Sequence, residues 1–247
     1  MKKLTILIMI LAAGLLAQDF DGLIAQADEQ HEADAYDAVF KLLKQAEQLD
    51  AENYEVIWRL ARAHFDFSDN TTDEVEIEKN LYAGFEYAEK ALKIGDDRAE
   101  SHKWYGILIG RVGEIEGTKQ EIENSYPMAE HTQKAIELDP DDAGNYHVMG
   151  RWHFALADLS WFERTIASIV YATPPEASFE KARGYFKQAI VKDPEDIRNY
   201  VWLGKTLEEL DDEDSAGQAY KQALGIEASS DSDKILQEEA KELLEDI

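Results

Sequence analysis

The sequence predicts an all-α fold built from helical repeats, and three observations support this prediction. Apolar residues recur at helical spacing in almost every segment, without the alternation that is typical of strands. Small residues recur in several segments, each time shortly before a turn. One stretch near the C-terminus contains a complete period of 34 residues. We therefore expect a tetratricopeptide-like right-handed superhelix of about five helical hairpins, with insertions and a C-terminal capping helix.

The first element is an apolar run from Leu4 to Ala17, preceded by Lys2 and Lys3 and followed by Gln18. As a helix this run would span about 21 Å, short of the roughly 30 Å hydrocarbon core of a membrane. The layout is typical of a bacterial secretory signal peptide over residues 1–17. We expect an exported protein, periplasmic or secreted; the alternative is an uncleaved anchor at the inner membrane. Residues 18–247 are then predicted to form a single α-solenoid domain.

Alanines mark the second helix of each predicted hairpin. They lie at Ala46, Ala91, Ala135, Ala189 and Ala223, which indicates five hairpins. Successive alanines are 45, 44, 54 and 34 residues apart, so only the last repeat has the regular length and the others contain insertions.

The last repeat shows the pattern most fully. Its small residues allow the two helices of a hairpin to approach closely, so bulky replacements would separate them. The acidic stretch 211–214 is expected to form a solvated loop that also caps the following helix. Residues 231–247 predict one more amphipathic helix, which covers the apolar end of the solenoid. The residues that define the repeat are Ala182, Phe186, Ala189, Pro194, Tyr200, Leu203, Gly204, Leu207, Ala216, Tyr220 and Ala223.

The longest insertion, residues 160–178, is rich in apolar residues. Capping boxes at residues 160–163 and 173–176 predict a short helix, a tight corner and then the regular second helix. Between the boxes, apolar residues form one stripe on the short helix. This stripe either extends the core against a neighbouring repeat or forms part of a lid over the binding groove. The residues concerned are Trp161, Phe162, Ile166, Ile169, Val170 and Tyr171.

Several segments resemble one particular family. SHKWYGILIG from Ser101, HTQKAIELDPDD from His131, HVMGRW from His147, and the insertion with its YATPP and EKARGYF are similar to the regulator of microtubule dynamics family. The similarity runs from about Ala99 to Ala223. It implies a non-enzymatic helical-repeat protein, whose animal members are associated with microtubules, the spindle, mitochondria and organelle contacts, including phospholipid handling. The bacterial-type export signal departs from the animal pattern, and an exported bacterial protein would not meet tubulin.

The composition excludes several classes of function. The chain has 52 acidic and 25 basic residues, a formal net charge of -27, which opposes binding to a nucleic-acid backbone. It contains no cysteine, which excludes disulfides, thiolate metal sites and cysteine nucleophiles. We expect no nucleic-acid partner, no cofactor and no stable transmembrane span after cleavage of the signal.

Three motif-like fragments fail the requirements of the sites that they imitate. The GKT fragment at 204–206 lacks the first glycine and the preceding strand of a phosphate-binding loop. The acidic residues in 66–74 lack the glycine and the closing glutamate of a calcium loop. His147 and His153 do not share a helix face as a metal-binding pair four residues apart would. We therefore expect structural or surface histidines, no metal site and no enzyme.

A candidate binding groove follows from the geometry of tetratricopeptide solenoids, in which the first helix of each hairpin lines the concave surface. Arginine forks bind carboxylates or phosphates, and tryptophans supply stacking or apolar contact. The groove is therefore expected to bind an acidic peptide or a phospholipid headgroup. The inward positions of the family correspond to Trp58, Arg59, Arg62, Phe65, Lys103, Trp104, Arg111, His147, Arg151, Phe154, Arg198, Trp202 and Lys205.

An alternative interpretation is that these arginines only balance nearby carboxylates, while the tryptophans belong to the core. The carboxylates would be those of Glu55, Asp66, Glu100 and Glu208. For the function, we expect a scaffold for protein–protein interaction. The alternative is a carrier of lipids or small amphiphiles that uses the groove and residues 160–178. An enzyme is the third class of function, and no catalytic arrangement in the sequence supports it.

Overall fold

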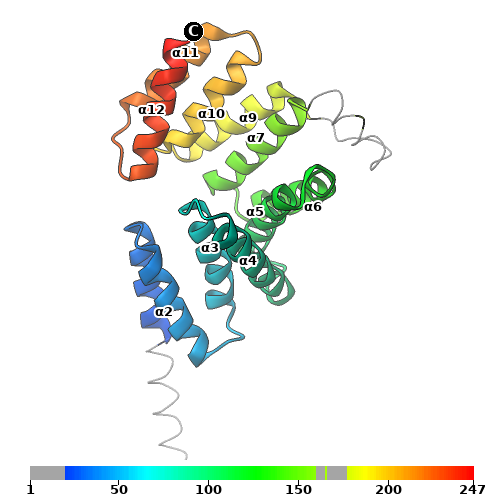
Figure 1. Cartoon of the computed structure of the whole chain (residues 1–247), viewed down its shortest axis with the longest axis vertical. Helices are drawn as coiled ribbons and strands as arrows, with labels where there is room; N and C mark the ends of the chain where they lie inside the picture. Colours follow the sequence, from blue (N-terminus) through cyan, green and yellow to red (C-terminus); the bar gives the residue numbers. More distant parts are fainter. Residues whose placement is uncertain (1–19, 160–164, 166–176) are drawn as a thin grey trace, which may run out of the picture. The chain divides into compact units, whose positions relative to one another are not determined.

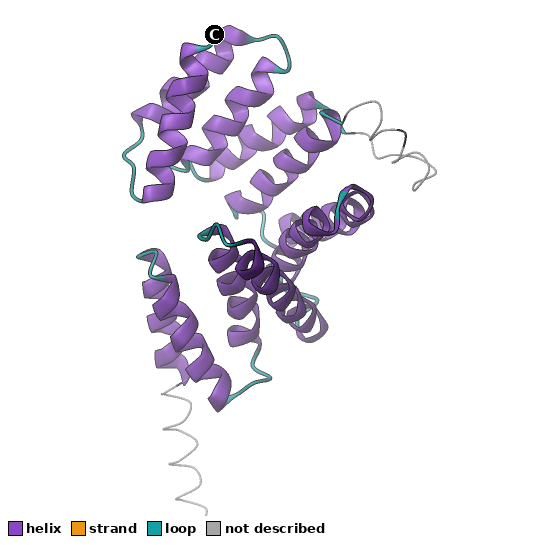
Figure 2. Cartoon of the chain, viewed as in Figure 1, coloured by secondary structure: helices purple, strands orange, loops and turns teal. Residues whose placement is uncertain are grey.

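A computed structural model describes residues 20–159, residue 165 and residues 177–247. All regular structure in these residues is helical, as predicted (Figure 2). The expected signal peptide, both capping boxes of the insertion and its whole apolar stripe lie outside the described residues. The core and lid interpretations of that insertion therefore remain predictions.

Except between α7 and α9, the helices follow one another with short connections (Figure 1). The first helical stretch covers residues 20–32 of the described chain. After it come α2 (Tyr36–Leu49), α3 (Tyr54–Asp69), α4 (Glu74–Ile94), α5 (Ala99–Glu116), α6 (Thr118–Leu138), α7 (Ala143–Ala157), α9 (Phe179–Lys192), α10 (Ile197–Glu208), α11 (Glu213–Gly225) and α12 (Asp231–Glu245).

The predicted hairpins are present, and the five alanines mark their second helices. Ala46, Ala91, Ala135, Ala189 and Ala223 lie in α2, α4, α6, α9 and α11, and all five side chains are fully buried. The helix pairs α3 with α4, α7 with α9 and α10 with α11 pack closely together. A methyl group fills the narrow space at each site without separating the helices, which explains why alanine recurs there.

Glycines of two first helices lie under large aromatic rings. A Cβ atom built on Gly150 of α7 would lie 2.6 Å from the ring of Phe186 in α9. At Gly204 of α10 the corresponding distance to the ring of Tyr220 in α11 is 2.2 Å. Both distances are far below van der Waals contact, so only glycine fits. The sequence-based assignment of Gly204 to helix packing is confirmed.

Polar side chains begin most of the helices. The side chains of Asn53, Asp142 and Asp196 accept backbone hydrogen bonds at the starts of α3, α7 and α10. Asp212 does so for α11, as expected for the 211–214 loop. Ser178 caps α9, which therefore begins at Phe179, after the predicted capping box at 173–176.

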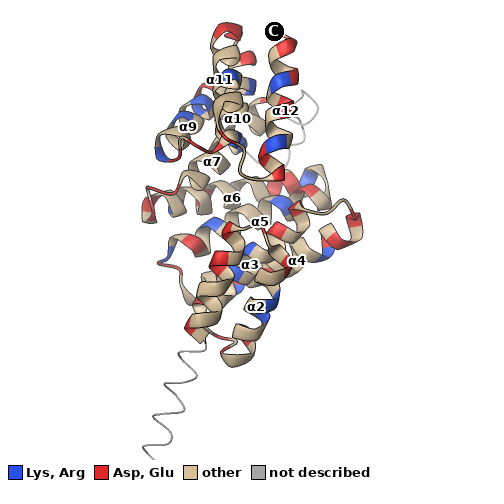
Figure 3. Ribbon diagram, turned by 90° about the vertical axis from the view of Figure 1, so that its left-hand side faces the viewer, with Lys and Arg blue, Asp and Glu red and all other residues tan. Residues whose placement is uncertain are grey.

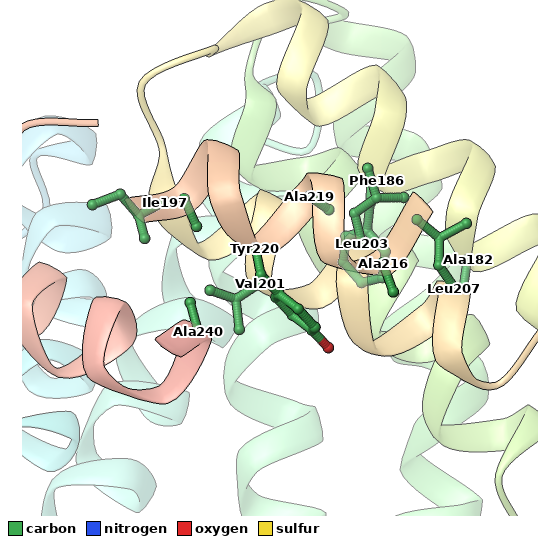
Figure 4. Packing of buried hydrophobic residues seen from close by; sticks show 11 residues of the cluster. Ala182, Phe186, Ile197, Val201, Leu203, Leu207, Ala216, Ala219, Tyr220 and Ala240 are labelled. Atoms are coloured by element: carbon green, nitrogen blue, oxygen red, sulfur yellow. The ribbon is translucent and has the colours of Figure 1, made fainter. Parts of the chain in front are cut away.

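The C-terminal helix α12 covers the last repeat, as predicted. Ser230 and Asp233 form a capping box at its start. Ala240 is fully buried, and Leu236 and Leu243 pack against the core of the last repeat. Figure 4 shows the buried side chains of this core, which come from α9, α10, α11 and α12. The remaining face of α12 is rich in charged residues, as is typical of a helix that caps a solenoid.

The chain divides into two compact units, residues 1–108 and 109–247, with the boundary inside α5. The prediction of one domain over residues 18–247 remains a prediction. Among the residues that the structure describes, no helix combines the length and the apolar composition needed to cross a bilayer.

Candidate binding site

In the first unit, two arginines of α3 surround the indole of Trp58. The guanidinium carbons of Arg59 and Arg62 lie 4.2 and 5.2 Å from the ring centroid. The indole itself is buried, and its Nε1 donates a hydrogen bond to Glu55 Oε2 at 3.1 Å. The side chains are therefore close together, as the mapping predicted, but the tryptophan belongs to the core.

A carboxylate from the preceding repeat occupies both of these arginines. Asp28, in the helical stretch 20–32, accepts two hydrogen bonds from Arg59, at 2.8 Å from Nε and 2.7 Å from Nη2. Arg62 Nη2 donates to the same carboxylate at 3.2 Å. Burial alone would raise the pKa of Asp28, but hydrogen bonds and charge from Arg59 and Arg62 hold it below its usual value. This bidentate pair joins two successive first helices.

The alternative interpretation of these arginines was therefore right about Glu55, and the charge of Asp66 acts to raise the pKa of Arg62, but the interpretation did not include Asp28. Glu55 Oε2 lies 2.8 Å from Arg59 Nη1, as expected. Asp28 was missed because it lies 31 residues before Arg59, beyond the reach of arguments based on adjacent helical turns. The signal that points to it is the repeat itself, because this separation is close to the tetratricopeptide period of about 34 residues.

The remaining candidates of the first unit lie on α3 and α5. Phe65 and Trp104 have ring centroids 5.8 Å apart, and Lys103 Nζ lies 5.7 Å from the Trp104 ring. Trp104 is buried, and its Nε1 donates to Glu100 Oε2 at 3.0 Å. Arg111 lies beyond the boundary, in the second unit, where its Nε is 3.3 Å from Glu114 Oε2. The two tryptophans of this unit thus expose little surface to a ligand.

In the second unit, four predicted residues of α7 and α10 lie together. Three of them surround the half-buried indole of the fourth, Trp202. The guanidinium carbon of Arg151 lies 3.8 Å from the centroid of Trp202, and Lys205 Nζ lies 4.5 Å from it. Phe154 meets the same indole edge-on, with centroids 5.3 Å apart. Arg151 is exposed to solvent. We call Arg151, Phe154, Trp202 and Lys205 the Trp202 cluster.

Carboxylates lie beside this cluster. Lys205 Nζ lies 2.5 Å from Glu239 Oε1 of α12. Arg198, one turn before Trp202, binds Asp196 at the start of its own helix, at 2.9 Å from Nε and 2.8 Å from Nη2. Glu239 was missed for the same reason as Asp28, since it follows Lys205 by 34 residues, one repeat period.

His147 lies beside the cluster but does not add a positive charge to it. Its Nδ1 is 2.8 Å from Asn199 Oδ1. Burial, followed by the positive charges of Arg198 and Arg151, lowers the pKa of His147 to about 4. His147 is therefore neutral at pH 7 and serves as a hydrogen-bonding partner in the packing of α7 against α10.

His153 is a structural residue, as expected. It is buried, and its ring stacks on Tyr185 with a centroid distance of 5.2 Å and an interplanar angle of 20°. Trp152 contacts it edge-on at 4.8 Å. Within the described ranges, no group of three or more His, Asp or Glu side chains is arranged to hold a metal ion.

Comparison with known proteins places this architecture in a family. The sequence matches the family described as regulator of microtubule dynamics protein 1-3 over residues 23–247. This chain belongs to the regulator of microtubule dynamics family. The match covers the first unit as well, and so extends well beyond the segment from Ala99 to Ala223 in which the sequence analysis found the resemblance.

The relatives include proteins 1 and 3 of this family. Regulator of microtubule dynamics protein 1 of Bos taurus is 38% identical over 228 residues, which cover 92% of this chain and 71% of the bovine protein. Regulator of microtubule dynamics protein 3 of Rattus norvegicus is 32% identical over 229 residues, covering 92% of this chain and 49% of the rat protein.

Solved structures confirm the repeat fold. A thermophilic tetratricopeptide-repeat protein of Thermus thermophilus superposes with a TM-score of 0.67 at 14% identity, covering 91% of this chain and 98% of that protein. The pilF protein of Pseudomonas aeruginosa superposes with a TM-score of 0.58 at 13% identity, covering 94% and 86%. This member of the regulator of microtubule dynamics family is thus an all-α protein with a tetratricopeptide-like fold.

Proposed function

We propose that this family member is a non-enzymatic scaffold that binds a protein partner through the first helices of its repeats. The Trp202 cluster is the observation that carries this proposal. Two cations lie within 4.5 Å of one indole, and Arg151 remains exposed. Such a site combines an apolar platform with donors for a carboxylate, which suits an acidic peptide segment.

The local charge supports an acidic ligand. Arg151 is the sole formally charged residue of α7, and α10 has Arg198 and Lys205 against Glu208. These two helices are therefore net positive in a chain whose formal charge is -27. Opposite charges on the two partners would favour encounter and orientation of the complex.

We assign a different role to the equivalent residues of the first unit. Arg59 and Arg62 have side chains only 12% and 13% exposed, and Asp28 already binds both. Opening these pairs would leave buried charges without partners, which is unfavourable. We therefore propose that the acidic group of the ligand is bound by the second unit, while Arg59 and Arg62 hold the first repeats together.

Charge reversal at Arg151 tests the proposal. The Arg151→Glu protein should recover much less of its partner in a quantitative pull-down from the native cell, because a carboxylate would replace the donor for the ligand. The matched control is Lys221→Glu on α11, which makes the same charge change at an exposed lysine outside the cluster. Equal recovery by the wild type and the Arg151→Glu variant would refute the proposal.

Mass spectrometry of the purified protein distinguishes the lipid alternative. A co-purified phospholipid that disappears in the Arg151→Glu variant would assign the cluster to an amphiphile headgroup instead of a peptide.

We further propose that the protein is exported, on the basis of the charged and apolar layout of residues 1–17. N-terminal sequencing of the protein isolated from its native cell tests this, since a mature chain that begins near residue 18 is expected.

A further inference from the structure

Helix α9 is unusually basic for this protein. It contains Lys181, Arg183, Lys187 and Lys192 against a single acidic residue, Glu180, a net charge of +3. The chain as a whole has a formal charge of -27. Figure 3 shows the basic positions of α9 in blue. A positive helix in a strongly acidic chain is a distinct electrostatic feature of the surface.

The basic residues lie on and beside the side of α9 that faces away from the core. The inner side carries the fully buried residues Ala182, Phe186 and Ala189. The opposite side, which we call the outer face of α9, consists of Arg183, Gly184, Lys187, Gln188 and Val191, together with the exposed carboxylate of Glu180 in the first turn. Of these, Lys187, Gln188 and Val191 are exposed, and Val191 has 80% of its surface in solvent.

Gly184 lies in the middle of this face, and no packing contact within the described residues explains it. A Cβ atom built there would meet no atom within 4 Å. Gly150 and Gly204 differ, because aromatic rings lie directly above them. Glycine in a helix interior disfavours the helix and exposes its backbone. A flat, open position of this kind allows another helix to approach α9 closely.

Glu180 offsets one positive charge of the outer face, since the charge of Arg183 contributes to the lowered pKa of Glu180, and this leaves the face with a net positive charge within the described part of the chain. No carboxylate there lies within 4.0 Å of the nitrogens of Arg183 or Lys187. At the end of the helix, by contrast, Lys192 Nζ is 2.7 Å from Asp141 Oδ1. Glu180 lies in the first turn, where backbone and Ser178 hydrogen bonds lower its pKa. Arg183 and Lys187 thus present donors to solvent beside an exposed valine.

We propose that the outer face of α9 is a docking surface for an acidic helical segment of a partner protein. The partner backbone would approach at Gly184, its carboxylates would bind Arg183 and Lys187, and an apolar side chain would cover Val191. Residues four positions apart in a helix are separated by about 6 Å along its axis. The partner segment therefore carries two carboxylates one turn apart, with an apolar residue one turn further.

This surface is separate from the proposed groove. The outer face of α9 belongs to a second helix of a hairpin, whereas the Trp202 cluster lies on the first helices α7 and α10. Val191 is a single apolar anchor, which provides little area for insertion into a membrane. An anionic bilayer or a second copy of the chain would bring a large negative charge against the formal charge of -27, whereas a short acidic segment brings only a few charges, which the local positive charge of α9 can attract. An acidic protein segment fits the observations best.

A synthetic helical peptide tests the proposal with the full-length protein. The labelled peptide carries two glutamates four residues apart and a leucine four residues further, and its binding is measured by fluorescence anisotropy. The Arg183→Glu/Lys187→Glu protein should bind it about tenfold more weakly, because two attractions become repulsions. Val191→Ser should weaken binding by about threefold through loss of the apolar contact. A peptide with glutamines in place of both glutamates should lose affinity for the wild type.

Lys221→Glu on α11 is the matched control, since Lys221 is also exposed and has no carboxylate within 4.0 Å in the described part of the chain. Its affinity for the peptide should remain within about twofold of the wild type. Circular dichroism of every variant verifies folding, which is expected to be unaffected at these surface positions.

Several results would overturn the proposal. These are the absence of peptide binding by the wild type, and equal losses in the double variant and in Lys221→Glu, which would indicate non-specific attraction. Binding to phosphatidylcholine/phosphatidylserine vesicles that disappears in the double variant, without peptide binding, would assign the face to a membrane. A dimer in sedimentation equilibrium that the double variant dissociates would assign it to a second copy of the chain.

Discussion

At the scale of single residues, three glycines of this chain have opposite roles. Gly150 and Gly204 provide the space for Phe186 and Tyr220, whose rings pack directly over the helix backbone. At Gly184, no atom of the residues that the structure describes occupies the space beside the backbone. Identical residues are therefore a packing requirement in two helices and an unfavourable choice for stability in the third.

Replacement of Gly204 by alanine should destabilise the protein by about 1–3 kcal/mol, because the new methyl group would overlap the ring of Tyr220. Gly184→Ala is the control, and it should stabilise the protein by up to about 1 kcal/mol through helix propensity alone. Urea unfolding monitored by circular dichroism measures both changes. If Gly204→Ala were neutral, the close packing of Tyr220 on α10 would be incorrect.

Buried histidines stack on tyrosines in both units. His64 lies parallel to Tyr87 at 5.6 Å with an interplanar angle of 19°, as His153 does to Tyr185. Burial lowers the pKa of His64, and it lowers the pKa of His153 to about 4, with the charge of Lys181 as a second cause. These rings therefore function as neutral aromatic residues in the hairpins.

The lowered pKa of His153 predicts a loss of stability in mild acid. Between pH 6.5 and about 4 the unfolded state binds a proton that the folded state does not, so the free energy of unfolding decreases as the pH falls through this window. From pH 8 to pH 5 the contribution of His153 is about 2 kcal/mol.

The variant His153→Phe keeps an aromatic ring but does not titrate at this position. Its free energy of unfolding should therefore decrease less than that of the wild type between pH 8 and pH 5, as measured by urea denaturation at each pH. Parallel pH profiles for the two proteins would show that His153 is protonated in the folded state.

At the scale of helices, ion pairs connect equivalent first helices at both ends of the repeat series. Asp28 of the stretch 20–32 binds Arg59 of α3, and Glu239 of α12 binds Lys205 of α10. Each pair spans one repeat along the chain. The capping helix α12 therefore packs on α10 as a first helix packs on its neighbour, both by covering apolar surface and by binding a cation of α10.

Loss of the capping box should weaken α12. Ser230→Ala removes the side-chain acceptor for the Asp233 backbone N–H, a hydrogen bond of 3.0 Å. We expect destabilisation by about 1 kcal/mol. The control Ser232→Ala, in the exposed first turn of the same helix, should have little effect. Hydrogen exchange of the α12 amides provides the measurement, and equal protection in the two variants would contradict the role of Ser230.

At the scale of the whole chain, the charge is distributed unevenly. The formal charge of -27 coexists with a positive α9 and with net positive α7 and α10. The α12 helix that follows is strongly acidic, with six carboxylates against two lysines. Self-repulsion of this excess charge opposes folding, and salt screens it.

The melting temperature should therefore rise with salt. Between about 0.02 and 0.2 M sodium chloride we expect an increase of a few degrees. Lys221→Glu makes the charge more negative and should enlarge this increase. Thermal melts followed by circular dichroism measure the effect. A melting temperature that falls with salt would show that attractive surface ion pairs outweigh the repulsion.

Much of the fold follows from the sequence. Helical spacing of apolar residues predicted an all-α chain, five alanines located the second helices, and Gly204 was correctly assigned to helix packing. Family geometry placed Arg151, Trp202 and Lys205 on one face, and the structure brings these three side chains together. These features are local or periodic, so one sequence contains the information.

Only the tertiary structure decided which predicted groove residues have carboxylate partners and which side chains are exposed. Asp28 holds Arg59 and Arg62, Trp58 is buried, and His147 is neutral despite its place in a basic region. Burial and long-range pairing depend on side chains that other repeats supply, and helical spacing within one repeat does not contain them. The sequence thus determined the family and the repeat, whereas the packing of successive repeats decided where charge and apolar surface remain accessible to a partner.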